Sequence, residues 1–462
     1  MPKTRSSISK ELNEMPNNRF IERPRSFCSL GGALLTVTAL PGVIPILHTA
    51  MGCGGSIYWN QYGSTGYLGA GYCGGLAVPS SNIQEKDIIF GGSDRLEEQV
   101  RTTIELIDGE VFMILTGCTA DIIGDDIQAV VRQYRNEGIN IFGAETGGFH
   151  GNGYKGHDIV MTVLTGEFIE TKKEKNKNKI NLLGIVPGQD AFWRGNLLKT
   201  RALLEKLGLE VNSFFTEHDT LENIRNAGDA ALTVVVSDFY AHQTAKTLQE
   251  VHQIPYIVNP FPIGPTATEA FLKKIAEALD IAPQTVNEVI AAETQQYFRY
   301  VERVADAYND LDWQRYAVVV GDANYAPAIT KFLADDFGWL PELMVVTDDI
   351  DDEDKPKINA VVTSLTSHYP VTIAYESDPT EIKTHFWKVV PRKTDSLYQN
   401  TFSPGFVVGS HLEREFATDI GAGHLTVSYP VVNRIVLNRG YAGYDGSLSL
   451  IEDLLSVIAA QR

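Results

Sequence analysis

The sequence predicts an α/β fold built from three Rossmann-like domains with parallel sheets. Short apolar segments of strand length alternate with amphipathic helical patterns along most of the chain, which is typical of β-α-β units. The chain has 462 residues, which is too long for one ordinary domain. We expect a polar N-terminal arm at residues 1–25, followed by domains at 26–170, 180–310 and 311–462.

The first domain is predicted from buried strands and the helix between them. The segment VFMILTGC (111–118) predicts a strand, and INIFGAET (139–146) predicts the next one. The segment between them, ADIIGDDIQAVVRQYRNEG, predicts one helix. Its apolar face would consist of Ile123, Ile127, Val130 and Val131.

The lysine-rich segment TKKEKNKNK (171–179) predicts a solvated linker and a domain boundary. After it, the second domain has strand segments at 180–188 and 231–238 and a third at IPYIVNP, with helical patterns between them. A long helical connection then extends to about residue 310. This alternation predicts a parallel sheet covered by helices.

The third domain begins with the strand and helix pattern of RYAVVVGDANYAPAITKFLADDFGW. Further strand candidates are ELMVVTDD, NAVVTSL, PVTIAYE and GFVVGS. A helix near 447–460 closes the chain. The acidic segment TDDIDDED (347–354) lacks the central glycine and terminal glutamate of a calcium loop, so we interpret it as a solvated loop.

The charge and hydropathy of the chain argue against nucleic-acid binding, secretion and membrane insertion. The net charge of −19 disfavours a nucleic-acid-binding surface. The polar N-terminus lacks the apolar core of a signal peptide, and the longest apolar runs are too short to cross a membrane. We therefore expect a cytoplasmic protein that binds neither nucleic acid nor membrane.

A glycine-rich stretch extends from Met51 to Gly75 and contains GAGYCG (69–74), a formal match to the dinucleotide fingerprint. The segment before it is not a convincing strand, and Pro79 argues against a helix directly after it. The stretch is more typical of a structural loop whose backbone can approach another group closely. Nearby, His48 is expected to be a buried, hydrogen-bonded histidine or a hydrogen-bonding neighbour of a cluster.

The four cysteines, Cys28, Cys53, Cys73 and Cys118, all lie within the first 118 of the 462 residues. Cys28, Cys53 and Cys118 stand beside glycine or other small residues, and Cys118 follows a predicted strand. Open α/β sheets bind ligands at the carboxyl ends of their strands, and iron–sulfur clusters need thiolates. Since no C-x-x-C spacing occurs, the residues alone leave both a metal–sulfur cluster and inert buried thiols open.

Several segments together resemble component 1 of nitrogenase and its relatives. They are PGVIPILHTAMGCGG, IQEKDIIFGGSDRLEEQV, TGCTADIIGDDIQAVV, QIPYIVNPFPIGPTATEAFLKKIAEAL and GYAGYDGSLSLIEDLL, in family order across nearly the whole chain. The resemblance implies three Rossmann-like domains of the nitrogenase component 1 type. It also implies an eight-iron P-cluster (8Fe-7S) at an interface of α-type and β-type subunits, with Cys28, Cys53 and Cys118 as this chain's ligands.

The resemblance is to the β-type (K-like) subunit. In α-type subunits a second-domain cysteine and a third-domain histidine hold the active-site cofactor. Here Ser237 takes the cysteine's place, and VSYPVVNRIVLNR contains no histidine. The implied role is an electron-transfer subunit without catalytic side chains of its own. It would pass electrons from an ATP-dependent iron protein to the α-type catalytic (D-like) subunit of an α2β2 heterotetramer.

The chain also departs from the molybdenum-type pattern. The segment TGGF (146–149) lacks the serine found at this place in that pattern, and the usual ligand set does not explain Cys73. These departures favour a nitrogenase-like methylthio-alkane reductase, which cleaves carbon–sulfur bonds. The alternatives are a dinitrogen-reducing β subunit, an assembly scaffold, a protochlorophyllide-reductase-like subunit with a 4Fe-4S cluster, and a nucleotide-dependent enzyme with inert thiols.

Overall fold

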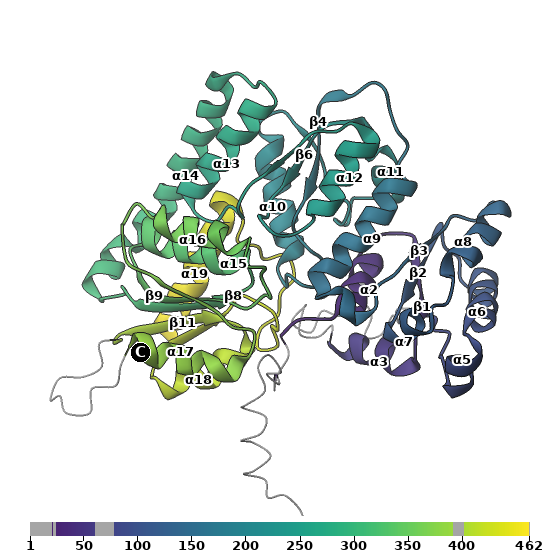
Figure 1. Cartoon of the computed structure of the whole chain (residues 1–462). Coiled ribbons are helices and arrows are strands. Elements are labelled where there is room, and N and C mark those ends of the chain that lie inside the picture. Colours follow the sequence, from purple (N-terminus) through teal and green to yellow (C-terminus); the bar gives the residue numbers. More distant parts are fainter. Residues whose placement is uncertain (1–20, 22–24, 61–77, 391–401, 462) are drawn as a thin grey trace, which may run out of the picture.

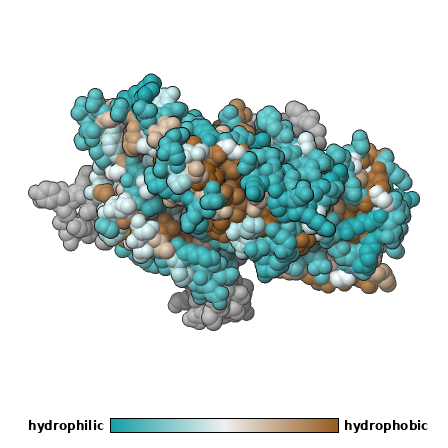
Figure 2. Space-filling model, turned by 90° about the horizontal axis from the view of Figure 1, so that it is seen from above, coloured by the Kyte–Doolittle hydropathy of each residue, from teal (hydrophilic) through white to brown (hydrophobic). Residues whose placement is uncertain are grey.

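A computed structural model describes residue 21 and residues 25–60, 78–390 and 402–461 (Figure 1). The fingerprint GAGYCG, Cys73 and most of the N-terminal arm lie outside these described residues. Figure 2 shows that hydrophilic side chains cover most of the face seen from above, as the composition predicts. Within the described residues, no helix combines the length and the apolar character needed to cross a membrane.

Three parallel sheets confirm the predicted fold class (Figure 1). Their strand orders are β1-β2-β3, β5-β4-β6-β7 and β10-β9-β8-β11-β12. The strands are β1 (Val43–His48), β2 (Val111–Thr116), β3 (Ile141–Ala144), β4 (Asn176–Leu183), β5 (Glu210–Asn212), β6 (Ala230–Val235), β7 (Tyr256–Val258), β8 (Tyr316–Gly321), β9 (Leu340–Val346), β10 (Thr372–Tyr375), β11 (Gly405–Gly409) and β12 (Gly423–Thr426). Every pair of neighbouring strands in these sheets is parallel.

Helices cover the sheets and connect them. Around the first sheet lie α2 (Ser29–Ala39), α3 (Met51–Asn60), α5 (Glu85–Phe90), α6 (Ser93–Leu106), α7 (Cys118–Ile123), α8 (Ile127–Asn136) and α9 (Gly153–Glu167). The next part of the chain forms α10 (Trp193–Glu205), α11 (Leu221–Arg225), α12 (His242–His252), α13 (Pro265–Ala278) and α14 (Pro283–Asp310). The third sheet is accompanied by α15 (Tyr325–Lys331), α16 (Lys355–Thr363), α17 (Ile382–Val389), α18 (Arg414–Asp419) and α19 (Gly443–Ala460).

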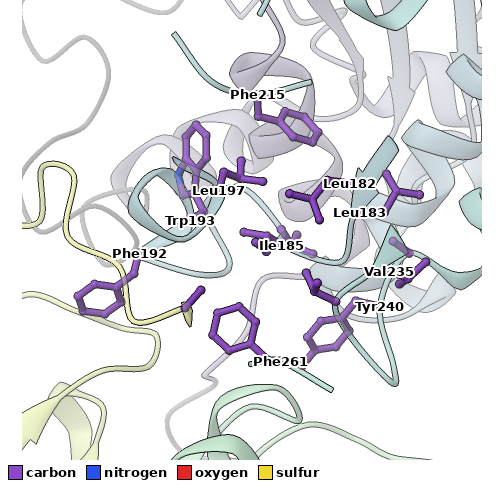
Figure 3. Packing of buried hydrophobic residues seen from close by; sticks show 14 of the residues in the cluster. Leu182, Leu183, Ile185, Phe192, Trp193, Leu197, Phe215, Val235, Tyr240 and Phe261 are labelled. Atoms are coloured by element: carbon purple, nitrogen blue, oxygen red, sulfur yellow. The ribbon is translucent and has the colours of Figure 1, made fainter. Parts of the chain in front are cut away.

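One continuous hydrophobic core includes side chains from all three sheets, among them Leu115, Val234 and Val319. Figure 3 shows its part around the second sheet, where Leu182 of β4 packs with Trp193 and other side chains of α10. Burial of this kind is the main favourable term in folding. The three sheets therefore pack around shared apolar side chains.

The lysine-rich segment is strand rather than linker at residues 176–179, so that prediction is wrong there, although residues 176–178 are exposed as predicted. The strand β4 begins at Asn176. Lys179 is buried, and its Nζ lies 2.8 Å from Asp229 Oδ1. Lys175 donates to the His252 carbonyl over 2.8 Å. Because these ammonium groups find carbonyl and carboxylate acceptors, their apolar stems can lie against the protein.

The single helix predicted after β2 is in fact two helices, α7 and α8. Gly124 breaks it in the left-handed conformation, with φ of 79°. Asp126 then caps α8 by accepting a hydrogen bond from the Ala129 N–H over 2.9 Å. Three of the four predicted apolar-face residues are buried, Ile127, Val130 and Val131.

One prediction for the third sheet is also wrong, and one strand of this sheet has no counterpart among the predicted segments. The segment NAVVTSL, expected as a strand, lies mostly in α16, where Pro356 occupies the first turn and Ile358 is buried. Conversely, β12 was not among the strand candidates. Its four residues pair in parallel with β11, so the partner strand supplies the order that its short GHLT sequence does not indicate.

Candidate cluster-binding site

Two of the candidate ligands, Cys53 and Cys118, follow neighbouring parallel strands. The residues His48 and Thr116, which end β1 and β2, are partners in the register. Cys53 lies in α3 and Cys118 begins α7, the helices that directly follow these strands. Because the carboxyl ends of parallel strands meet at one edge, both cysteines lie at that edge, and α3 and α7 lie close together there (Figure 1).

The loops that carry these two cysteines are in direct contact. The Gly117 N–H donates to the His48 carbonyl over 3.0 Å. A Cβ at Gly117 would lie 2.1 Å from Thr49 Oγ1, so only glycine permits this approach. The backbone geometry therefore fixes the start of α7 relative to the segment that leads to Cys53.

The third candidate, Cys28, is placed by close packing between helices. It precedes α2, and an isolated antiparallel bridge joins it to Asn152, just before α9. The helices α2 and α9 approach closely because two glycines lie between their backbones. A Cβ at Gly32 would lie 1.9 Å from the Gly153 carbonyl oxygen, and one at Gly156 would lie 1.9 Å from that of Ser29.

Cys28 and Cys118 meet at Gly148. The Gly148 N–H donates to Cys118 Sγ over 3.0 Å. A Cβ at Gly148 would lie 3.2 Å from Cys118 Sγ and 3.9 Å from Cys28 Sγ. The sequence shows that TGGF lacks a serine, but it does not reveal this contact, which depends on a loop 30 residues away in the chain.

Asp121 holds the Gly148 loop against α7. Its Oδ2 accepts from the Gly147 N–H over 2.9 Å and lies 3.1 Å from His150 Nε2. The Asp121 side chain is largely buried, whereas that of His150 is partly exposed. This carboxylate thereby helps to orient the N–H group that reaches Cys118.

The donor set fits a large cluster at an open surface better than a single ion. Cys28, Cys53 and Cys118 are free thiols, with Cys28 and Cys118 exposed and Cys53 half-buried. Within the described ranges, no three His, Cys, Asp or Glu side chains are close enough together to hold one metal ion. Exposed thiols beside a glycine-lined cradle are suited to an inorganic cluster that extends beyond this chain.

His48 is fully buried and hydrogen-bonded at both ring nitrogens. Its Nδ1 lies 2.9 Å from Ser81 Oγ, and its Nε2 lies 3.0 Å from Asp125 Oδ2. Burial lowers the pKa of His48 below its ordinary value, although Asp125 opposes this shift. The ring is therefore neutral at pH 7 and joins the end of β1 to the turn between α7 and α8.

Ser237, which the resemblance places at the position of the α-type cofactor cysteine, is held by protein partners. It is fully buried, donates to Asn324 Oδ1 over 2.7 Å and accepts from the Tyr240 N–H over 2.9 Å. Its partner Asn324 borders two cavities, one of about 10 Å³ beside Tyr154 and one of about 160 Å³ beside Phe239.

The acidic segment 347–354 is not wholly solvated, so that prediction is wrong for Asp348. Its carboxylate accepts hydrogen bonds from the Tyr240 hydroxyl and, over 2.8 Å, from the Ala323 N–H. The Tyr240 ring stacks on Tyr154 with ring centroids 3.8 Å apart. Burial, with the nearby Asp322 carboxylate, raises the pKa of Asp348 to about 7.

Comparison with known proteins identifies the family of the chain. The family model described as nitrogenase component 1 type oxidoreductase matches residues 28–459. The chain is 22% identical to the nitrogenase vanadium-iron protein beta chain of Trichormus variabilis, over 91% of this chain and 90% of that protein. It is 23% identical to the molybdenum-iron protein beta chain of Sinorhizobium fredii, over 95% and 84% of the two chains.

Matches to an alpha chain and to a solved structure complete the comparison. The nitrogenase molybdenum-iron protein alpha chain of Methanosarcina barkeri is 28% identical, but over only 48% of this chain and 42% of its own length. A structure described as nitrogenase Cp1 at pH 6.5 has the same fold, with a TM-score of 0.78 at 16% identity, covering 98% of this chain and 97% of its own. The chain therefore belongs to the nitrogenase component 1 type oxidoreductase family.

Proposed function

We propose that this chain is the β-type subunit of a nitrogenase-like reductase and relays electrons through an iron–sulfur cluster that it shares with an α-type partner. The observation that carries the proposal is that the Cys28 and Cys118 thiols both lie beside Gly148, at the sheet edge that also carries Cys53. The full-length likeness to beta chains supports the subunit type.

The three thiolates, Cys28, Cys53 and Cys118, would ligate a P-cluster of the 8Fe-7S type. Such a cluster, when bound, supplies reversible electron storage. The chain's own contribution is to hold the ligands and to donate hydrogen bonds to their sulfurs. The Gly148 N–H does so at Cys118, and N–H···S bonds of this kind tune the reduction potential.

An α-type subunit would complete the ligand set. Cys28 and Cys118 are exposed in this chain, and thiolate ligands of a cluster are normally shielded from water. A partner that contributes its own cysteines across the interface would bury both thiols. This assembly is the αβ pair of an α2β2 heterotetramer.

An ATP-dependent iron protein would dock near this edge. Three consecutive residues at the end of α5, Ile88, Ile89 and Phe90, are 54%, 73% and 87% exposed. Ile122 of α7 is 76% exposed and belongs to the helix that begins with Cys118. Exposed apolar residues grouped in this way are typical of protein-binding surfaces. Docking here would bring an external electron donor near the cysteines.

The subunit would not hold the substrate-reducing cofactor itself. Ser237 offers no thiolate, and its hydroxyl is satisfied within the protein by Asn324 and Tyr240. Substrate reduction would then take place in the α-type partner. The residues of this chain act as ligands and positioning groups rather than as acids or bases.

For the substrate, we propose carbon–sulfur bond reduction of methylthio-alkanes, with dinitrogen reduction as the alternative. The support is the Gly147–Gly148 pair in place of the serine-containing stretch of molybdenum-type subunits. A side chain at Gly148 would lie within 4 Å of two candidate ligand thiols, so this site differs from one in which a serine side chain stands beside the cluster.

Anaerobic co-purification with the α-type partner tests the proposal. We expect about eight irons per αβ pair beyond the partner's cofactor, and a P-cluster-like EPR signal on oxidation. With iron protein and ATP, a methyl thioether should be reduced, whereas ammonia from dinitrogen would favour the alternative substrate. About four irons would indicate a 4Fe-4S reductase, and loaded protein without turnover would indicate an assembly scaffold. A folded, iron-free complex would overturn the cluster assignment.

A further inference from the structure

We propose that His48 and Asp125 are positioning residues that clamp the helix carrying Cys118 and tie it to the exposed apolar end of α5. The inference rests on the proposed function, because it assigns these residues to the same cluster site. Neither residue is a candidate ligand. Their proposed role is to set the geometry of the ligand loops and of the docking surface together.

His48 contacts both ends of α7. At the start of this helix, the His48 carbonyl accepts the Gly117 N–H over 3.0 Å, next to Cys118. Beyond its end, the His48 ring nitrogen Nε2 lies 3.0 Å from Asp125 Oδ2. A six-residue helix has little stability of its own, so contacts at its two ends largely decide its position.

The same histidine closely precedes the segment that carries Cys53 and is fixed there by Ser81. His48 ends β1, and α3 begins three residues later with Met51. The ring nitrogen Nδ1 lies 2.9 Å from Ser81 Oγ, and both side chains are buried. With a neutral ring, Nε2–H donates to Asp125 and Nδ1 accepts from the serine hydroxyl.

Asp125 extends the clamp to α5. Its Oδ1 accepts from the Gly92 N–H over 2.8 Å, in the turn that follows Phe90. A Cβ at Gly92 would lie 2.6 Å from Asp125 Oδ2 and 3.2 Å from His48 Cε1, so glycine is required for this approach. The Asp125 side chain is only 4% exposed, although the neighbouring Ile122 and Phe90 are among the most exposed apolar residues.

One hydrogen-bond network around His48 and Asp125 therefore joins the residue that precedes Cys118 to the turn that follows Phe90. A shift in the His48–Asp125 pair would move the start of α7, which carries Cys118, and the turn that orients Phe90. Ligand orientation and hydrogen bonding to the thiolates set the potential of an iron–sulfur cluster. The His48–Asp125 pair would contact neither the cluster nor the iron protein. Its loss should nevertheless change both the reduction potential of the cluster and the affinity for the iron protein.

The test uses the whole complex with its α-type partner, purified anaerobically. The variants are His48→Leu, His48→Gln, whose amide N–H can replace Nε2–H, and Asp125→Asn. His385→Leu is the matched control, because His385 also lies against a carboxylate, 3.3 Å from Glu376, but near the third sheet. The measurements are iron per αβ pair, the cluster midpoint potential by EPR-monitored titration, and the dissociation constant of the iron protein.

We expect His48→Leu to change the equilibrium constant for cluster reduction by about tenfold, which is about 59 mV for a one-electron couple. It should also weaken iron-protein binding by about tenfold. His48→Gln should recover most of both properties, Asp125→Asn should change them in the same direction as His48→Leu, and His385→Leu should change neither.

Wild-type potential and affinity in iron-loaded His48→Leu, or equal effects of His385→Leu, would overturn the inference. If His48→Leu fails to assemble, His48→Gln and Asp125→Asn decide the question by the same two readouts, and unchanged values in both would overturn it. An iron-free wild-type complex would instead overturn the proposed function itself.

Discussion

The Gly148 N–H donates a hydrogen bond to Cys118 Sγ over 3.0 Å, and a Cβ at position 148 would lie only 3.2 Å from the same sulfur. This contact joins the loop after β3 to the helix after β2. It brings a backbone donor, two free thiols and the edge of a parallel sheet to one place. Single substitutions in this loop and on the surfaces around it should therefore have distinct, measurable effects.

Replacement of a candidate ligand should remove the cluster without unfolding the chain. In Cys118→Ala we expect iron content to fall by more than half and electron transfer to the partner to be lost, because thiolates are needed to hold the cluster. Thr102→Ala, on the exposed face of α6, is the control. The measurements are iron analysis and activity of the anaerobic complex. Full iron content and activity in Cys118→Ala would contradict the ligand assignment.

A methyl group at position 148 should disturb both thiols. In Gly148→Ala the new Cβ would lie 3.2 Å from Cys118 Sγ, which is tighter than ordinary contacts, so the loop must shift. We expect a changed cluster potential and lower iron content. In the control Gly166→Ala, on α9, the new Cβ would make only an ordinary contact of 3.5 Å with Thr247. Equal EPR titrations of the two variants would argue against the N–H···S contact.

The exposed end of α5 should decide iron-protein affinity. Phe90 is 87% exposed, and burial of such a side chain in an interface commonly contributes about 2 kcal/mol. We expect Phe90→Ser to weaken binding at least tenfold, as measured by titration of the iron protein with ATP present. Phe298→Ser, on exposed α14 away from α5 in Figure 1, should leave affinity unchanged. Wild-type affinity in Phe90→Ser would place the docking surface elsewhere.

The Asp348 carboxyl group should make the stability of the folded chain depend on pH. The folded pKa of Asp348 is raised from 3.8 to about 7, so the folded state binds its proton more tightly than the unfolded state. The contribution of protonated Asp348 to the free energy of unfolding is fully present below about pH 4 and is lost as pH rises through about 7. In Asp348→Asn, whose amide oxygen can still accept from Tyr240 and Ala323, this loss should disappear.

We therefore expect Asp348→Asn to be more stable than the wild type by about 4 kcal/mol at pH 8 and by little at pH 4, as measured by urea unfolding at several pH values. The control Asp352→Asn removes a carboxylate whose pKa is lowered by Lys355 at the surface. That variant should not gain stability at pH 8. Parallel stability curves for wild type and Asp348→Asn across this range would exclude a raised pKa at Asp348.

The sequence by itself determined the fold class and the regions around the candidate ligands. Buried strands such as VFMILT leave a clear apolar run, and this run alone predicts that the cysteine after β2 lies at the carboxyl end of a strand. Such features are local, because a run or period of apolar residues reports the burial of one element. The family resemblance drew on the same segments, and the family match spans residues 28–459.

Only the tertiary structure decided which groups meet. The donor to Cys118 is a backbone N–H thirty positions later, and the partner of His48 is Asp125, 77 positions away. The tertiary structure likewise paired Lys179 with Asp229 and brought Asp348, a member of an acidic segment, into a hydrogen bond with Tyr240. No local pattern encodes these contacts, because each depends on the distance between elements set by sheet order and helix packing. Residue type and the spacing of apolar residues determined the helices and strands, whereas close packing between them determined which groups meet at the candidate cluster site.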